Sequence, residues 1–386
     1  MESNAKKKTG YLVFYLLAFI SLGATTFGSV ILTEAGQMMN LPRPWLIEFF
    51  RYRVPISIGI GIALALIVIV QFRYRVATRK IFIMILVGNA VGLFVINSFV
   101  PDYWLRSQHY IAEYTSIEEA DRLLGEDDDV FVLEINGDAR AFPRDWMMLP
   151  HFAGGEIGGE HVAMSYCVLS NLPLAFSSQF DGQPTEYKVI AQAHNNLIFT
   201  DRVSGELIQQ ITGTALLSNR KLEQYPAQRM PWHAFKSLYP EGKVLHYIEK
   251  NLLDKITDKM FTKELIKHYA GKPIFPTLDL KDNRLPSEEL VWGLDINGKQ
   301  IAVALSAFKD ERVIPVELGD QHFLLAWFPE YETLGAFRAQ GEGIQQDLKI
   351  DPYGNTTSGK LERVHMYSGL LWMVWSHWYS DTKVLK

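Results

Sequence analysis

Three long apolar segments near the start of the chain constrain its fold most strongly. Residues 11–32, 54–72 and 81–100 contain no Asp, Glu, Lys or Arg. A helix rises about 1.5 Å per residue, so each segment can cross a hydrocarbon core of about 30 Å. The segments therefore predict three transmembrane helices and a lipid bilayer as partner, with Pro55 in the first turn of the second helix. The alternative for any one of them is a buried helix of a soluble protein.

Positive residues predict the orientation of these helices, because cytoplasmic loops are enriched in Lys and Arg. Lys6, Lys7 and Lys8 precede the first segment. The short link between the second and third is also basic (Arg73, Arg75, Arg79, Lys80). The first loop carries arginines too, but Glu34 and Glu48 lie among them. We therefore expect a cytoplasmic N-terminus, three spans, and the region after residue 100 outside the cytoplasm.

Charge and cysteine content narrow the function further. The formal net charge is −5, and the sequence has no zinc finger, basic stripe or glycine-rich phosphate loop. We therefore expect no nucleic-acid partner. Cys167 is the one cysteine in 386 residues, which suits an oxidising compartment because no unintended disulfide can form within the chain.

An internal repeat organises the rest of the chain. Trp232 to Tyr239 followed by Lys243-Val-Leu matches Trp372 to Tyr379 followed by Lys383-Val-Leu, and Asn136-Gly137 matches Asn297-Gly298. The offset is 161 between the Asn-Gly pairs and 140 between the tryptophans, so the second copy lacks about twenty residues. The Asn-Gly pairs predict β-hairpins.

The repeat predicts four regions. They are a membrane segment (1–100), a first β-rich lobe (101–248), an amphipathic helix with a linker (249–286) and a second, degenerate β-rich lobe (287–386). The expected fold class is α+β and β-rich, built from two copies of one unit. We expect the amphipathic helix to pack against a lobe, with the membrane surface as the alternative.

The first copy holds a motif that the second lacks, namely Ser165-Tyr-Cys-Val-Leu-Ser170. Its matching stretch, residues 325–330, has no thiol. His151 and His161 precede Cys167, and His194 follows it. Because shared residues serve the common scaffold, this difference is the best place to look for chemistry.

Several motifs resemble the bacterial family known as domain of unknown function 3179. They are Leu133-Glu-Ile-Asn-Gly-Asp-Ala-Arg140-Ala-Phe-Pro143, Ile157-Gly-Gly159, Tyr166-Cys167-x-x-Ser170, Thr200-Asp-Arg202, Thr212-Gly213 and Leu222-Glu-Gln-Tyr-Pro226. The family's usual Tyr-Cys-Pro-Leu-Cys, sometimes with selenocysteine, implies thiol redox or metal chemistry. Here Val168 replaces the proline and Ser170 the second cysteine. The three spans are not part of the family domain. Because the family is bacterial, the orientation inferred from the positive residues predicts an inner-membrane protein whose soluble region is periplasmic or extracellular.

Cys167 is therefore the candidate catalytic residue, with Ser170 and His151 beside it. A Cys-x-x-Ser pair cannot close a disulfide, but its thiolate can form a mixed disulfide with a thiol-containing protein. Ser170 could donate a hydrogen bond to the thiolate, and His151 could act as base, which predicts a thiol pKa below its usual value. The alternative is that Cys167 is a small buried apolar residue.

Metal binding is the second hypothesis for the same region. Cys167, His151, His161 and His194 form a Cys/His set of the kind that holds copper or zinc. Their spacing matches no known finger. Asp201 and Arg202 are expected to form a salt bridge within a turn. The competing function class is a non-catalytic binding or scaffold subunit, in which the spans hold a membrane protein partner and the thiol is incidental.

Overall fold

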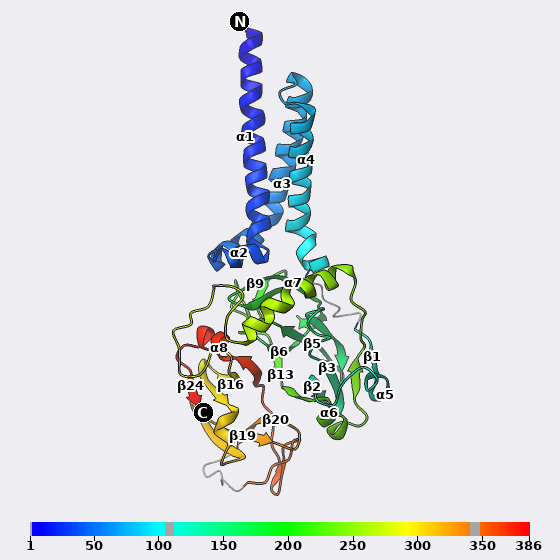
Figure 1. Ribbon diagram of the computed structural model, residues 1–386, viewed down its shortest axis with the longest axis vertical. Helices are drawn as coiled ribbons and strands as arrows, with labels where there is room; N and C mark the ends of the chain where they lie inside the picture. Colours follow the sequence, from blue (N-terminus) through cyan, green and yellow to red (C-terminus); the bar gives the residue numbers. More distant parts are fainter. Residues whose placement is uncertain (1, 105–111, 340–347) are drawn as a thin grey trace. The chain divides into compact units, whose positions relative to one another are not determined.

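The computed structural model describes the chain except for residues 1, 105–111 and 340–347. The chain divides into two compact units, residues 1–104 with 190–193, and residues 105–189 with 194–386. The first unit is helical and the second is rich in β-strands (Figure 1). Both β-rich lobes expected from the sequence belong to the second unit.

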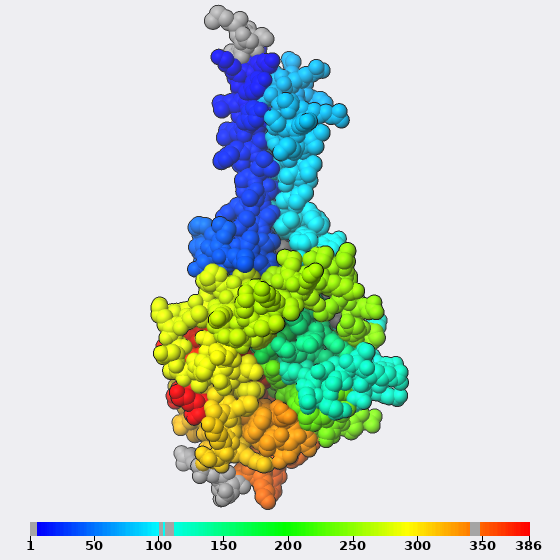
Figure 2. Space-filling view, in the orientation of Figure 1, coloured from blue at the N-terminus to red at the C-terminus, as the bar shows by residue number. Residues whose placement is uncertain are grey.

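The helical unit contains the predicted apolar segments. Its elements are α1 (Glu2–Ile31), the short α2 (Glu34–Met38), α3 (Arg43–Tyr74), α4 (Arg79–Phe94) and the π-helical η1 (Val95–Trp104). Helices α1 and α4 pack side by side (Figure 2). Among the described residues, three helices are long and apolar enough to cross a membrane, at Lys6–Ile31, Arg43–Tyr74 and Arg79–Phe99.

Helix α3 begins earlier than its apolar segment. The sequence placed Pro55 in the first turn, but the helix starts at Arg43 and Pro55 lies inside it. The prediction was wrong because it took the start of the uncharged run as the start of the helix. Pro44, in the first turn, is the residue that suits that position.

The first half of the β-rich unit begins with the hairpin predicted at Asn136-Gly137, and both residues have positive φ (51° and 85°). Its elements are β1 (Tyr114–Ser116), α5 (Ile117–Ala120), β2 (Asp129–Ile135), β3 (Asp138–Pro143), β4 (Phe152–Ile157), β5 (Glu160–Cys167), β6 (Leu172–Ser177), β7 (Gln179–Phe180), β8 (Gln183–Pro184), β9 (Tyr187–Ala193), β10 (Asn196–Asp201), β11 (Leu207–Gln209), β12 (Thr214–Ala215), β13 (Gln224–Tyr225), β14 (Ala227–Pro231), α6 (Trp232–Leu238) and β15 (Lys243–Leu245).

Helix α7 (Leu252–Tyr269) connects this half to the second, in which Asn297-Gly298 again forms the hairpin turn. The second half comprises β16 (Leu290–Ile296), β17 (Lys299–Ala304), η2 (Leu305–Phe308), β18 (Val313–Leu318), β19 (Gln321–Phe328), β20 (Thr333–Ala339), β21 (Asn355–Thr356), β22 (Gly359–Lys360), β23 (Tyr367–Leu371), α8 (Trp372–Trp378) and β24 (Lys383–Leu385).

Strand pairing in the two halves follows one numerical rule. Val130 pairs with Pro143, and Val291 pairs with Ala304, each 161 residues later. The same offset relates the β4–β5–β6 pairings to those of β18–β19–β20. After each half's last antiparallel strand, a short helix leads to a strand that pairs in parallel, β15 with β3 and β24 with β17.

The β-rich unit contains five sheets of three or more strands among its described residues, in a propeller-like arrangement. One core cluster lies between the sheets of the first half, around Phe131, Met164 and Tyr166. The corresponding cluster of the second half surrounds Trp292, Leu325 and Phe323. Of the candidate site residues, His161 and Cys167 lie in β5, and His151, Ser170 and His194 lie outside the strands of the first half.

Candidate functional site

The Cys-x-x-Ser motif lies in the turn between β5 and β6. Cys167 is the last residue of β5 and pairs with Leu172, the first residue of β6. Asn171 has a positive φ of 55°, which Asn tolerates better than most residues and which closes the turn. The motif is therefore a hairpin loop, with its cysteine fixed by the strand ladder.

The thiol of Cys167 is completely buried. Its Sγ lies 3.7 Å from the carbonyl oxygen of Asn195, which stands in the turn before β10. Burial raises the pKa of Cys167, although the Ser170 side chain and the amides of Ser170, Leu169 and Leu197 act in the opposite direction. The sequence predicted a lowered pKa. That prediction was wrong, because desolvation of the thiolate outweighs the donors around it.

The C-terminal turn of α7 holds the same loop by its backbone. His268 Nε2 lies 2.5 Å from the carbonyl oxygen of Leu169, and the Tyr269 hydroxyl donates to the carbonyl oxygen of Val168 at 2.6 Å. His268 is completely buried. The loop is thus covered by a helix that lies about a hundred residues later in the chain.

His151 is buried just before β4 and binds backbone instead of the thiol. Its Nδ1 lies 3.2 Å from the carbonyl oxygen of Tyr166. Burial lowers the pKa of His151 to about 4, against a smaller opposing effect of that hydrogen bond. His151 is therefore neutral at pH 7 and supplies no imidazolium to stabilise a thiolate. A catalytic role for Cys167, Ser170 and His151 stays a prediction.

The four candidate metal ligands are not gathered at one point. His161 lies near the start of β5, opposite Glu156 on β4. His194 lies in the turn between β9 and β10, where its Nδ1 is 2.8 Å from the Thr277 carbonyl oxygen and its ring stacks on His377. In the part of the chain that the structure describes, no three His, Cys, Asp or Glu side chains could hold a metal ion together.

A buried amide network beside the thiol was not anticipated from the sequence. Asn196 Nδ2 donates to Gln210 Oε1 at 2.8 Å, and Asn196 Oδ1 accepts from Gln209 Nε2 at 2.8 Å and from the Ile211 amide at 2.9 Å. Gln210 Nε2 donates to Ser165 Oγ at 2.9 Å. All these side chains are completely buried. Paired polar residues at the ends of apolar strands, Asn195-Asn196 and Gln209-Gln210, were the available signal.

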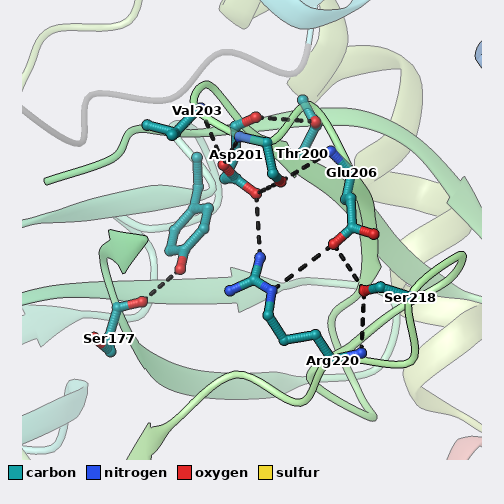
Figure 3. Close-up of polar contacts among 9 residues, drawn as sticks. Ser177, Thr200, Asp201, Val203, Glu206, Ser218 and Arg220 are labelled. Atoms are coloured by element: carbon teal, nitrogen blue, oxygen red, sulfur yellow. Dashed lines mark hydrogen bonds and ion pairs between the residues drawn. The ribbon is translucent and has the colours of Figure 1, made fainter. Parts of the chain in front are cut away.

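A second polar cluster surrounds Asp201, the last residue of β10 (Figure 3). Asp201 Oδ1 accepts from the amides of Val203 and Ser204, and its Oδ2 lies 3.4 Å from Arg220 Nη2. The Ser204 hydroxyl also donates to this carboxylate. The sequence paired Asp201 with Arg202, but Arg202 pairs with Glu186 instead, at 2.7 Å.

The interactions around Asp201 have a structural role. Arg220 Nε lies 3.8 Å from Glu206 Oε2, and the guanidinium stacks on the Phe180 ring at 4.4 Å. Glu206 in turn accepts from the Ser218 hydroxyl at 2.9 Å. The carboxylate of Asp201 is thus satisfied by turn amides and an arginine, an arrangement that fixes a turn.

Comparisons with known proteins agree with these motifs. A family model described as a protein of unknown function, DUF3179, matches residues 110–382. Neither the search of curated proteins nor the search of solved structures gave a match. The matched region covers nearly all of the β-rich unit, including the Cys-x-x-Ser loop and the Asp201 turn. The chain therefore belongs to the DUF3179 family.

Proposed function

We propose that this protein is a membrane-anchored binding or scaffold protein in which the Cys-x-x-Ser loop has a structural role. The observation that carries the proposal is the complete burial of Cys167 together with its raised pKa. A thiol reacts as its thiolate and needs access to its partner. Cys167 is neither ionised nor accessible, because its protonated sulfur lies behind α7 and the amide network.

The second half of the β-rich unit supports this assignment. Cys167 pairs with Leu172, and Phe328 pairs with Thr333 at the position 161 residues later. Phe328 is buried as well. A position that accepts a large apolar side chain in one half and a thiol in the other is typical of core packing.

Thiol labelling tests the proposal. We expect iodoacetamide to label Cys167 in the full-length protein only after unfolding, because the sulfur is buried. Cys167→Ala should retain folding and binding properties, with Ser170→Ala as its matched control within the same loop. Rapid labelling of the folded protein below neutral pH would contradict the structural role.

Thiol redox chemistry is the second candidate, and one observation favours it. The Ser170 side chain and three backbone amides near the sulfur act to lower its pKa, against the larger effect of burial, which raises it. Such donors would stabilise a thiolate if α7 moved away from the loop. Tyr269→Phe removes the hydroxyl that binds Val168, so labelling that accelerates in this variant would favour the redox candidate over the structural one.

We further propose that the β-rich unit lies outside the cytoplasm and forms the periplasmic or extracellular domain of an inner-membrane protein. The basic residues before α1 and between α3 and α4 support this orientation. An alkaline phosphatase fused after Lys386 should be active, and a fluorescent protein fused there should be dark. The reverse result would overturn the orientation.

The two halves of the β-rich unit, we infer, arose by duplication. The constant offset of strand registers supports this, and so does an identical helix end. Tyr239 after α6 and Tyr379 after α8 both have φ of −132° and ψ of 64°. An experimental structure in which Trp232 and Trp372 occupy unrelated positions after superposition of the halves would overturn it.

A further inference from the structure

Each half of the β-rich unit contains a tyrosine after its short helix, Tyr239 and Tyr379. In the second half, the ring of Tyr367 fills the space beside Tyr379. Tyr379 lies with its hydroxyl 3.0 Å from that of Tyr367 on β23. Both hydroxyls lie within hydrogen-bond distance of the Ile211 carbonyl oxygen, at 3.1 and 2.9 Å. Tyr367 is 1 % exposed, so this site is closed.

Gln228 occupies the position of Tyr367 in the first half. It pairs with Val132, and Tyr367 pairs with Gly293, the residue 161 positions after Val132. Gln228 Nε2 also donates to the Tyr239 hydroxyl at 2.9 Å, as the Tyr367 hydroxyl meets that of Tyr379. A shorter amide therefore stands where the second half has a phenol ring.

The shorter side chain coincides with a cavity of about 400 Å³. Its lining includes Glu134, Gln228, Tyr239, Tyr353, Lys360 and Arg363. Gln228 is 3 % exposed, and its Oε1 has no hydrogen-bond partner among the described residues. A buried carbonyl without a donor is costly, which indicates that a donor from outside the chain completes it.

The charged residues around the filled site at Tyr367 and around the cavity at Gln228 also differ. At the filled site, Lys221 of the first half reaches Asp295 of the second, with Nζ 3.8 Å from Oδ2. The corresponding groups at the cavity are Lys360 of the second half and Glu134 of the first, because Leu222 and Leu361 make equivalent bonds to Gly213 and Gly354. No ion pair joins Lys360 to Glu134 in the described residues.

The other charges of the cavity are partly engaged. Arg363 donates to the Pro352 carbonyl oxygen and stacks on Phe337, with its guanidinium carbon 4.8 Å from the ring centroid. Glu362 accepts from Arg338 at 2.9 Å. Glu134 Oε1 accepts from the Gly137 amide at 2.8 Å. The two halves together thus present an ammonium, a guanidinium, a carboxylate and an amide oxygen to one cavity.

We propose that this cavity binds a small zwitterion, an amino acid or short peptide. Gln228 Oε1 and Glu134 accept from the ligand's ammonium group, and Lys360 with Arg363 binds its carboxylate. The volume suits a small molecule, since ligand sites usually measure about 300–1,000 Å³. A neutral sugar would leave the Glu134 carboxylate and the Lys360 and Arg363 cations without groups of opposite charge. This assignment deepens, and rests on, the proposed binding function.

Calorimetry on the detergent-solubilised full-length protein tests the proposal. The probes are glycine, glutamate, lysine and alanyl-alanine, with glucose and maltose as neutral comparisons. We expect at least one zwitterion to bind with a Kd of about 1 mM or tighter. Binding of the sugars alone, or of none of the probes, would overturn the proposal.

Two variants locate the binding site. Gln228→Tyr reproduces the filled site of the second half, so it should abolish binding while leaving the unfolding temperature unchanged or higher. Glu134→Gln should weaken zwitterion binding by about tenfold or more, whereas Asp295→Asn at the matched position should not change it. Unchanged affinity in Gln228→Tyr would overturn the site, and it would leave the thiol-labelling test of the structural role unaffected.

Discussion

Burial has the largest effect on the pKa of Cys167 and of His151. Cys167 and His151 were chosen from the sequence as a reactive pair. The structure buries both, raises the pKa of one and lowers that of the other. Each group is therefore held in its neutral form, which is the form that a protein interior favours.

The pH dependence of stability follows from His151. Its pKa is about 4 in the folded protein and about 6.5 when unfolded. Between these values the unfolded state binds more protons, so stability is retained above pH 6.5 and falls as the pH drops toward 4. At about 1.4 kcal/mol per pKa unit, the loss is about 3 kcal/mol.

Urea unfolding across this pH range measures the effect. His151→Gln should reduce the slope of stability against pH, because the titrating group is gone. The exposed His246→Gln serves as control and should leave the slope unchanged. Equal slopes in His151→Gln and the wild type would contradict the assignment.

The amide network gives a second prediction at this scale. Asn196→Leu removes the acceptor of Gln209 and of the Ile211 amide and the donor to Gln210. Each buried unpaired group costs about 1–3 kcal/mol, so we expect a loss of about 3 kcal/mol or more in the free energy of unfolding. Asn283→Leu, at an exposed position outside the network, should cost little; similar losses in both variants would count against the network.

At the scale of elements, α7 combines two roles. Its last turn binds the Cys-x-x-Ser loop, and its opposite face exposes apolar residues among lysines. Leu252, Ile256, Met260 and Ile266 are between 45 and 76 % exposed. The contacts of its last turn confirm the prediction that α7 packs against a lobe, and for its exposed apolar residues we propose the sequence's alternative, a membrane surface.

Depth measurements test the position of α7. In a Cys167→Ala background, a fluorophore on Met260→Cys should be quenched by spin-labelled lipids in anionic vesicles. A fluorophore on Leu217→Cys, another exposed apolar position, should not be quenched. Quenching at neither position would show that the exposed face of α7 is not on the bilayer.

At the scale of the whole molecule, strand registers in the two halves of the β-rich unit correspond at a constant offset of 161 residues. Trp232 and Trp372 each begin the short helix and are completely buried. The indole nitrogens donate to Asp121 and to the Asp282 carbonyl oxygen. These residues anchor equivalent parts of both halves.

Alanine substitutions at these anchors should be costly in both halves. Trp232→Ala and Trp372→Ala should each lower the free energy of unfolding by about 3–5 kcal/mol, because each removes a buried aromatic side chain. Chemical unfolding measures the loss, with the exposed Leu217→Ala as control. A loss in only one half would show that the two tryptophans have different structural roles.

Local patterns of residues were sufficient to predict several elements of the structure. Uncharged runs gave the three long helices, and the two Asn-Gly pairs gave the two hairpins, since helix length and turn conformation depend on neighbouring residues. The family motifs were likewise readable without a structure.

Contacts between residues far apart in the chain became visible in the folded protein alone. Asp201 pairs with Arg220 instead of the adjacent Arg202, and Cys167 is covered by a helix about a hundred residues later. The open cavity beside Gln228 depends on the absence of a ring that Tyr367 supplies in the other half. Such burial and pairing result from packing between segments remote in the chain, which periodicity and spacing do not encode.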